Sequence, residues 1–262
     1  MHKEQLQALK DWFAKYVIKF HNDVPEARTG IQLKEDHTWR VCDNILRIGR
    51  SLNLNPQDLN LAESIALLHD IGRFKQFSLY RTFNDRESAN HAHLGLQEIE
   101  ANEVLSGLDG AERHIILKAV EYHNLRDLPA MPPRQMLFAR MIRDADKLDI
   151  LKVYTEHYDQ ENNELAPVLG AGLPETQAYS PIFIENLLEN QKCLYSDIKN
   201  SNDRKLLQLS WIYDINFPYT MAAIKKKGYI EKTINFLPGT EDILKIHRHL
   251  QSYVTQFLDG KH

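Results

Sequence analysis

The sequence contains few cysteines and no long hydrophobic run. Its 262 residues include only two cysteines, Cys42 and Cys193, which lie far apart and form no C-x-x-C pair. This spacing suggests neither a disulfide framework nor a thiolate zinc site, so a metal would need other ligands. No window approaches the roughly 18 apolar residues of a membrane span, and the start MHKEQLQALK lacks a signal-peptide hydrophobic region. We therefore expect a cytoplasmic protein with no membrane partner.

The chain also lacks an excess of basic residues. Its 32 Lys and Arg are outnumbered by 36 Asp and Glu, which gives a formal net charge of -4. Proteins that bind the phosphate backbone of nucleic acid usually carry a basic surface. The charge balance therefore argues against stable nucleic-acid binding.

Alternating apolar residues around Asn-Gly or Asp-Gly, the pattern of β-hairpins, are absent as well. Helical periodicity extends over nearly the whole chain and predicts an all-α fold. No linker interrupts it, so we expect one domain over residues 1–262, with additional C-terminal helices from about residue 180. The expected helices cover about residues 3–20, 33–52, 55–72, 91–105, 111–125, 134–158, 182–201, 203–213, 220–227 and 239–258.

Local signals refine two of these boundaries. Asn55 is the expected N-cap of the third helix, with Pro56 at its first position, and Gly72 is its expected left-handed C-terminal cap. Residues 74–90 are predicted to form a long loop or a broken helix. Residues 159–180 are rich in acid, Gly and Pro, which predicts a surface excursion or lid.

Histidine is unusually placed among the residues that are present. The sequence has 12 histidines, and four of them, His37, His69, His91 and His123, each lie on the inward face of a different predicted helix. His91 is followed at an offset of four by Gly95, which lets another backbone or a ligand approach closely. A single such histidine is most simply a core residue bonded to a carbonyl. Four together favour a shared metal ion, because it satisfies all the buried imidazoles at once.

Carboxylates accompany these histidines. Asp70 directly follows His69, so both side chains can reach one ion at a helix end. The stretch RDADKLDIL supplies Asp144, Asp146 and Asp149. Asp149 lies deepest in the apolar stripe of that helix and the other two lie at its margins, so the periodicity leaves the choice of ligand open.

These residues resemble the HD superfamily of metal-dependent phosphohydrolases. The matching motifs are HTWRV at residues 37–41, LLHDIGR at 67–73, HAHLG at 91–95, AVEYHN at 119–124 and the distal DADKLD. The resemblance covers about residues 30–155 and implies an HD-type helical bundle. The Gly-Tyr-Pro signature of the family's cyclic-di-GMP phosphodiesterases is absent after His123, where the chain reads NLRDLP.

The resemblance to the binuclear branch of the superfamily also implies a ligand set. His91 rather than His93 would be a ligand, and Asp146 would be the distal ligand. Asp149 would contact the ligands rather than the metal itself. Asp70 would bridge two ions, one held by His37, His69 and Asp146 and the other completed by His91 and His123. A mixed set of imidazoles and carboxylates suits Fe, Mn or Zn.

The expected activity is hydrolysis of a phosphate ester of a small molecule or nucleotide by a metal-bound hydroxide, with Asp70 at the centre. Arg40, Arg73 and Lys147 are the candidate phosphate-binding residues, because arginine and lysine match phosphate oxygens. Tyr80 and Phe83 could stack on a base or anchor their loop. Two alternatives stay open: a di-iron HD-type oxygenase with the same six ligands, and a non-catalytic nucleotide or metal sensor.

Overall fold

The computed structural model describes residues 1–262 except 24–27, 159–171 and 261–262. All regular elements in these described ranges are helical and none is a strand, so the predicted all-α fold is confirmed. No helix in the described part of the chain combines the length and apolar character that crossing a membrane requires. The chain divides into two compact units, residues 1–149 and 150–262. The single domain over residues 1–262 stays a prediction.

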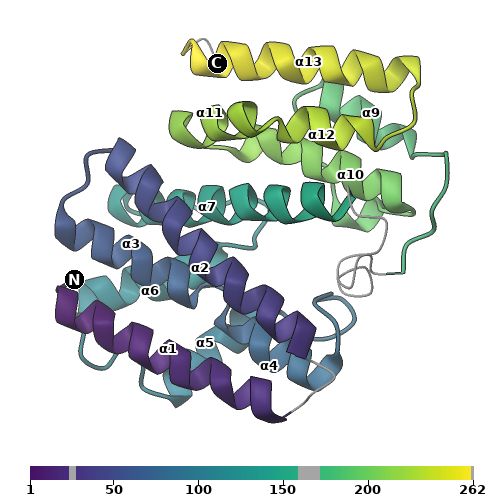
Figure 1. Cartoon of the computed structure of the whole chain (residues 1–262). Helices are drawn as coiled ribbons and strands as arrows, with labels where there is room; N and C mark the ends of the chain where they lie inside the picture. The colour runs from purple at the N-terminus through teal and green to yellow at the C-terminus, as the bar shows by residue number, and fades with distance from the viewer. Residues whose placement is uncertain (24–27, 159–171, 261–262) are drawn as a thin grey trace. The chain divides into compact units, whose positions relative to one another are not determined.

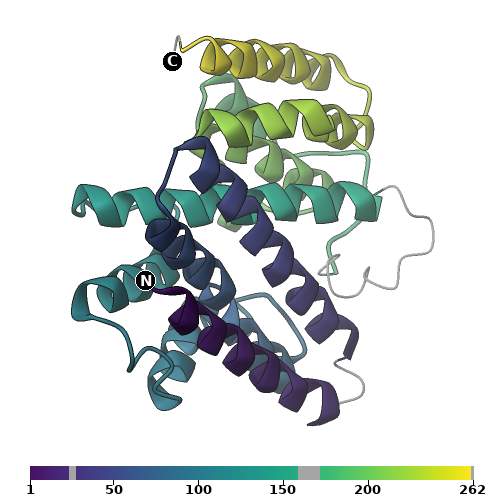
Figure 2. The same cartoon turned by 60° about the vertical axis from the view of Figure 1, so that its left-hand side comes forward.

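The first unit is a helical bundle built around α3. Helix α2 packs along α3, α4 packs along α5, and both α1 and α6 contact α3 (Figures 1 and 2). Apolar side chains that are completely buried fill the space between them, among them Ile45, Leu61, Ile65, Phe74 and Ile116. The unit contains α1 (Lys3–Asp23), α2 (Arg28–Ser51), α3 (Pro56–Leu68), α4 (Ile71–Tyr80), α5 (His91–Ala101), α6 (Gly110–Tyr122) and most of α7 (Pro133–Tyr158).

Side-chain caps start several of these helices where the sequence predicts them. Asn55 accepts a hydrogen bond from the Asp58 backbone N–H at 2.9 Å, which confirms Asn55 as the N-cap of α3. Asn90 caps α5 in the same way through the His93 N–H at 3.1 Å. Each cap satisfies a backbone donor that has no intrahelical partner. The Asn90 cap sets the first residue of α5, and that residue is His91.

The predicted end of the third helix at Gly72 is wrong. Helix α3 ends at Leu68, and a new helix, α4, begins at Ile71 and continues through Gly72 to Tyr80. Gly72 has no positive φ. A Cβ atom at this position would lie 2.1 Å from the His91 carbonyl oxygen and 2.5 Å from the Gly95 nitrogen. Gly72 is therefore required for the close approach of α4 and α5, and Gly95 allows the backbone contact that the sequence predicts.

The long loop or broken helix predicted over residues 74–90 is helical in its first part, because α4 continues to Tyr80, and irregular after it. Arg81, with a φ of 57°, ends the helix in the left-handed conformation, and residues 81–90 connect it to α5. The ring of Phe83 stacks on Phe77 with the ring centroids 4.5 Å apart. Phe83 is therefore an anchor of this connection, whereas Tyr80 is exposed.

The second unit is organised around α10, whose residues are nearly all buried. Helices α9 and α12 contact α10, and α13 packs on α9, α11 and α12. The helix predicted over residues 182–201 is too long: α9 ends at Leu188, just before Asn190 adopts a positive φ of 58°. The elements of this unit are α9 (Pro181–Leu188), η2 (Tyr195–Asp197), α10 (Ser201–Ser210), η3 (Trp211–Asp214), α11 (Pro218–Lys227), α12 (Tyr229–Asn235) and α13 (Glu241–Leu258).

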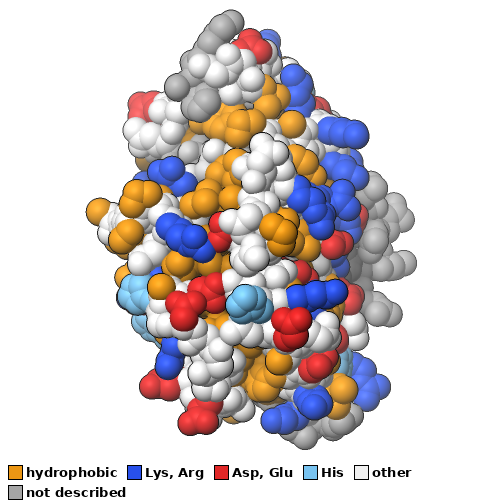
Figure 3. Space-filling view, turned by 90° about the vertical axis from the view of Figure 1, so that its left-hand side faces the viewer, with side chains coloured by type: hydrophobic (Ala, Val, Ile, Leu, Met, Phe, Trp, Pro, Cys, Tyr) orange, Lys and Arg blue, Asp and Glu red, His pale blue; other side chains and the backbone are white. Residues whose placement is uncertain are grey.

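The surface excursion or lid predicted over residues 159–180 lies largely outside the described residues, and its last part, from residue 172, contains no helix. The face of the molecule in Figure 3 carries side chains of both charges among hydrophobic ones. This mixture agrees with the small formal net charge of the chain.

Candidate metal centre

Two of the four inward histidines lie at the C-terminal ends of helices. His69 follows the last residue of α3, and His123 follows the last residue of α6. Each ring places Nδ1 2.7 Å from the carbonyl oxygen three residues earlier, His69 from Ala66 and His123 from Val120. The carbonyls of a last helical turn lack intrahelical partners, so an Nδ1–H is a suitable donor for them. The contact that completes each helix therefore also fixes the histidine ring.

The other two histidines pair with carboxylates. His37, in α2, donates from Nδ1 to Asp149 Oδ2 at 2.7 Å, and His91 donates from Nδ1 to Asp85 Oδ2 at 2.7 Å. A carboxylate acceptor requires a proton on Nδ1, which leaves Nε2 of a neutral ring with a bare lone pair. Metal-binding histidines are commonly oriented by such a carboxylate or carbonyl partner.

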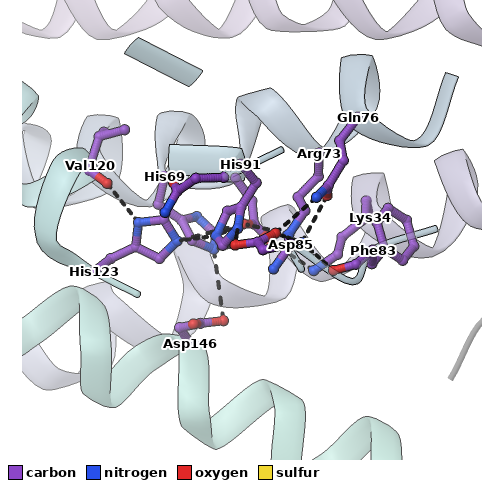
Figure 4. A network of polar contacts seen from close by, with 12 residues as sticks. Lys34, His69, Arg73, Gln76, Phe83, Asp85, His91, Val120, His123 and Asp146 are labelled. Atoms are coloured by element: carbon purple, nitrogen blue, oxygen red, sulfur yellow. Dashed lines mark hydrogen bonds and ion pairs between the residues drawn. The ribbon is translucent and has the colours of Figure 1, made fainter. Parts of the chain in front are cut away.

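The four Nε2 atoms converge on the carboxylate of Asp70. Figure 4 shows three of these histidines, His69, His91 and His123, close together. Asp70 Oδ2 lies 3.5 Å from His37 Nε2 and 3.7 Å from His69 Nε2. Asp70 Oδ1 lies 3.4 Å from His91 Nε2 and 3.6 Å from His123 Nε2. Asp70 precedes α4 but makes no capping hydrogen bond there, so both oxygens face the histidines. One carboxylate thus divides its oxygens between two buried groups of ligand atoms.

Asp146 of α7 extends the first of these groups. Its Oδ1 lies 3.1 Å from His37 Nε2 and 3.8 Å from His69 Nε2. The sequence left Asp144, Asp146 and Asp149 as alternatives, and the structure separates two of them. Asp146 faces Nε2 of His37, whereas Asp149 accepts from Nδ1 of the same ring.

The arrangement contains too many hydrogen-bond acceptors for the available donors. In the described part of the chain, the buried Nε2 atoms of His37 and His69 have no hydrogen-bond partner. Nε2 of His91 lies 2.9 Å from Nε2 of His123, although both rings already place their Nδ1 protons on oxygen acceptors. Bare lone pairs this close to each other and to a carboxylate repel unless a cation lies between them. The residues present therefore fit divalent metal ions.

Protonation equilibria agree with this interpretation. Burial alone would raise the pKa of Asp70, but Lys34, His69 and Arg73 hold it well below its usual range. Burial and the nearby Arg73 guanidinium lower the pKa of His91 to about 3, so this ring is neutral at pH 7. Burial and Lys34 oppose protonation of His37, yet the adjacent carboxylates of Asp146 and Asp149 raise its pKa. The carboxylates around His37 thus favour a positive charge at its Nε2.

Arg73 lies at the edge of the site and connects it to the segment between α4 and α5. Its Nη1 donates to the carbonyl oxygen of Phe83 at 2.6 Å, to Asp85 Oδ1 at 2.9 Å and to Gln76 Oε1 at 2.8 Å. Its Nε lies 3.5 Å from Asp70 Oδ1. Arg73 therefore lies beside the centre and is held there by its contacts with residues 83 and 85, and its contact with a phosphate stays a prediction.

The other two predicted phosphate-binding residues have different surroundings. Arg40 donates to Asp149 from Nε at 2.6 Å and from Nη2 at 3.0 Å, so its guanidinium is directed at the carboxylate that orients His37. Lys147 follows Asp146 in α7 and is partly buried. The structure thus connects Arg40 with the histidines indirectly, and contact of either residue with a phosphate stays a prediction.

Sequence reasoning missed Lys34 and Asp85. Lys34 donates to Asp70 Oδ2 at 2.7 Å, and it precedes His37 by three residues on α2, a spacing that places both on one face. That spacing was the available signal for Lys34. Asp85 belongs to an irregular segment, whose path no periodic pattern predicts.

Comparison with known proteins gives one match. A family model described as "HD domain" matches residues 35–167, about half of the chain. No curated protein and no solved structure matches.

Proposed function

Because this chain belongs to the HD domain family, we propose that it is a metal-dependent phosphohydrolase that acts on a phosphate ester of a small molecule or nucleotide. The family consists mostly of metal-dependent hydrolases, and two buried His/Asp groups in this chain could hold divalent ions. The observation that carries the proposal is the division of the Asp70 oxygens between these two groups.

In this proposal Asp70 is the shared ligand of two ions. The first ion would be held by His37, His69 and Asp146, and the second by His91 and His123. Nitrogen and carboxylate ligands in this ratio favour Fe, Mn or Zn. When bound, such a pair would supply Lewis acidity toward a phosphoryl group and would lower the pKa of an attacking water.

The residues of the chain would orient and enclose this chemistry. Asp149 and Asp85 keep the Nδ1 protons of His37 and His91 in place, so both Nε2 atoms stay available for coordination. Arg40 would act as a positioning residue through Asp149. The histidine side chains are nearly completely buried, whereas Asp146 is 17% exposed and Arg73 is 15% exposed. A substrate would therefore reach the centre from the side of Asp146 and Arg73.

A substrate panel tests this function. Protein loaded with Mn²⁺ or Fe²⁺ should release phosphate from at least one class among phosphomonoesters, phosphodiesters and nucleotides, and a chelator should stop the release. Absence of release across the panel would contradict the proposal. Dioxygen uptake with a phosphonate or polyol, without phosphate release, would favour the oxygenase instead.

Replacing Asp85 or Asp149, the carboxylates that orient His91 and His37, should weaken the binding of one metal ion more than that of the other. Asp85→Asn should lower metal affinity in the group of His91 and His123 by about 10- to 100-fold, the usual effect of losing such a partner. Asp149→Asn should have the same effect in the group of His37. Calorimetric titration of the metal-free variants with Mn²⁺ would resolve the two binding steps.

The matched control is Asp36→Asn, which changes an exposed carboxylate next to His37 in sequence that accepts a hydrogen bond from Gln32. It should leave both binding steps unchanged. Equal weakening of both steps by Asp85→Asn would show that the two groups do not bind separate ions.

A further inference from the structure

Lys34 is the cation closest to the shared carboxylate. Its Nζ lies 2.7 Å from Asp70 Oδ2, the oxygen that faces His37 and His69. The Lys34 side chain is 14% exposed, whereas that of Asp70 is 4% exposed. Lys34 is therefore in direct contact with the buried carboxylate and keeps more of its side chain accessible to solvent than Asp70 does.

The hydrogen-bonding capacity of Lys34 is mostly unused. An ammonium group has three N–H donors, and within the described residues only Asp70 accepts from it. Arg73 is held by more contacts, because its Nη1 lies within hydrogen-bond distance of acceptors in residues 76, 83 and 85, although its buried Nε has no hydrogen-bond partner among the described residues. Arg40 differs as well, since two of its nitrogens bind Asp149. Lys34 thus offers donors to a ligand without breaking a contact of its own.

The ring of Phe83 holds these cations in place. Lys34 Nζ lies 5.4 Å from the ring centroid and Arg73 Cζ lies 5.8 Å from it, distances at which a cation is attracted to an aromatic ring. Figure 4 shows Phe83 beside Lys34 at the end of the polar network. Because Phe83 stacks on Phe77, the ring is fixed before any ligand arrives.

We propose that Lys34 is a substrate-binding residue that donates its two remaining N–H groups to anionic oxygens of the substrate's phosphate. The inference rests on the proposed function and adds a specific phosphate contact that the sequence motifs do not include. The third N–H continues to donate to Asp70, so Lys34 would contact both a metal ligand and the phosphate. Its charge beside Asp70 also opposes the binding of cations to that carboxylate.

These two roles predict opposite effects of one substitution. In Lys34→Met, the affinity of the Mn²⁺-loaded protein for inorganic phosphate should fall by about 10- to 100-fold, the range for a lost hydrogen bond to a charged group. The affinity of the metal-free protein for Mn²⁺ should stay the same or rise, because a competing positive charge is gone. A residue with only a structural role would lower both affinities.

The experiment is calorimetry on the full chain with Mn²⁺ alone and then with inorganic phosphate. Lys34→Arg should recover part of the phosphate affinity, and Lys34→Gln provides a second uncharged variant in case Lys34→Met does not fold. Lys10→Met is the matched control, because it removes a lysine that pairs with Glu63 of α3. It should leave both affinities unchanged.

Wild-type phosphate affinity in Lys34→Met or Lys34→Gln would overturn the inference, as would a parallel loss of Mn²⁺ affinity. If the loaded wild-type protein hydrolyses a phosphate ester in either of these cases, the proposed function stands and only the role of Lys34 fails. If the loaded wild-type protein neither binds inorganic phosphate nor hydrolyses any ester, both proposals fail.

Discussion

Asp70→Asn should reduce phosphate release by at least about 1,000-fold, equivalent to about 4 kcal/mol of transition-state stabilisation. The reason is that one carboxylate serves both groups of ligands, with Oδ2 toward His37 and His69 and Oδ1 toward His91 and His123. Asparagine keeps the shape of the side chain but removes the negative charge and one of the two acceptor oxygens. Both ions should therefore be lost together, unlike in the variants of Asp85 and Asp149.

The measurements are the initial rate of hydrolysis and the metal content of the purified variant, with circular dichroism to verify the helical fold. Asp36→Asn again serves as the control and should keep the wild-type rate. An Asp70→Asn protein that retained two ions and more than a tenth of the activity would contradict the role assigned to this carboxylate.

Gly72→Ala should have the largest effect on stability. The new Cβ atom would lie 2.1 Å from the His91 carbonyl oxygen and 2.5 Å from the Gly95 nitrogen, and backbone atoms cannot move aside as a flexible side chain can. Overpacking of this kind costs about 1–3 kcal/mol and sometimes more, and we expect about 3 kcal/mol. The midpoint of thermal unfolding should fall by roughly 6–12 °C for a chain of this length. Separation of α4 from α5 should also move His91 away from Asp70.

Two further glycines calibrate this result. Gly107→Ala should be nearly neutral, because its Cβ would meet no atom within 4 Å. The loss of stability in Gly95→Ala should lie between those of the other two variants, because its new Cβ atom would lie 3.3 Å from the Ile71 side chain. Thermal unfolding followed by circular dichroism measures all three variants. If Gly72→Ala melted within about 2 °C of the wild-type protein, the close approach of α4 and α5 would not be required.

The same glycine shows why the sequence predicted helices better than their ends. A glycine after an apolar helical run often ends a helix, and the prediction for Gly72 followed that local rule. The structure uses Gly72 for the contact between α4 and α5, which depends on residues about 20 positions away. Asn190 is a second case: its positive φ follows α9 inside a segment that the periodicity predicted as helix. Tertiary contacts and local backbone conformation override periodicity at such positions.

In the candidate site, too, helical periodicity predicted some residues, whereas others depend on tertiary contacts. His37, His69 and His123 lie in apolar stripes, so their inward direction could be predicted from helical periodicity, and the structure buries all three. The contact of Asp85 with His91 could not be predicted, because the connection between α4 and α5 has no regular pattern. Lys34 was missed for another reason. A lysine on a helix is usually exposed to solvent, and its contact with Asp70 depends on how α2 and α4 pack.

The most direct test of this account is the number of metal ions that the chain binds. Native mass spectrometry of the protein reconstituted with Mn²⁺ should show two ions per chain for the wild type and one for a variant with both His91→Ala and His123→Ala. Two ions in the wild type and one in the variant would support two groups that share Asp70. A wild-type chain that binds no more than one ion under these conditions would contradict it.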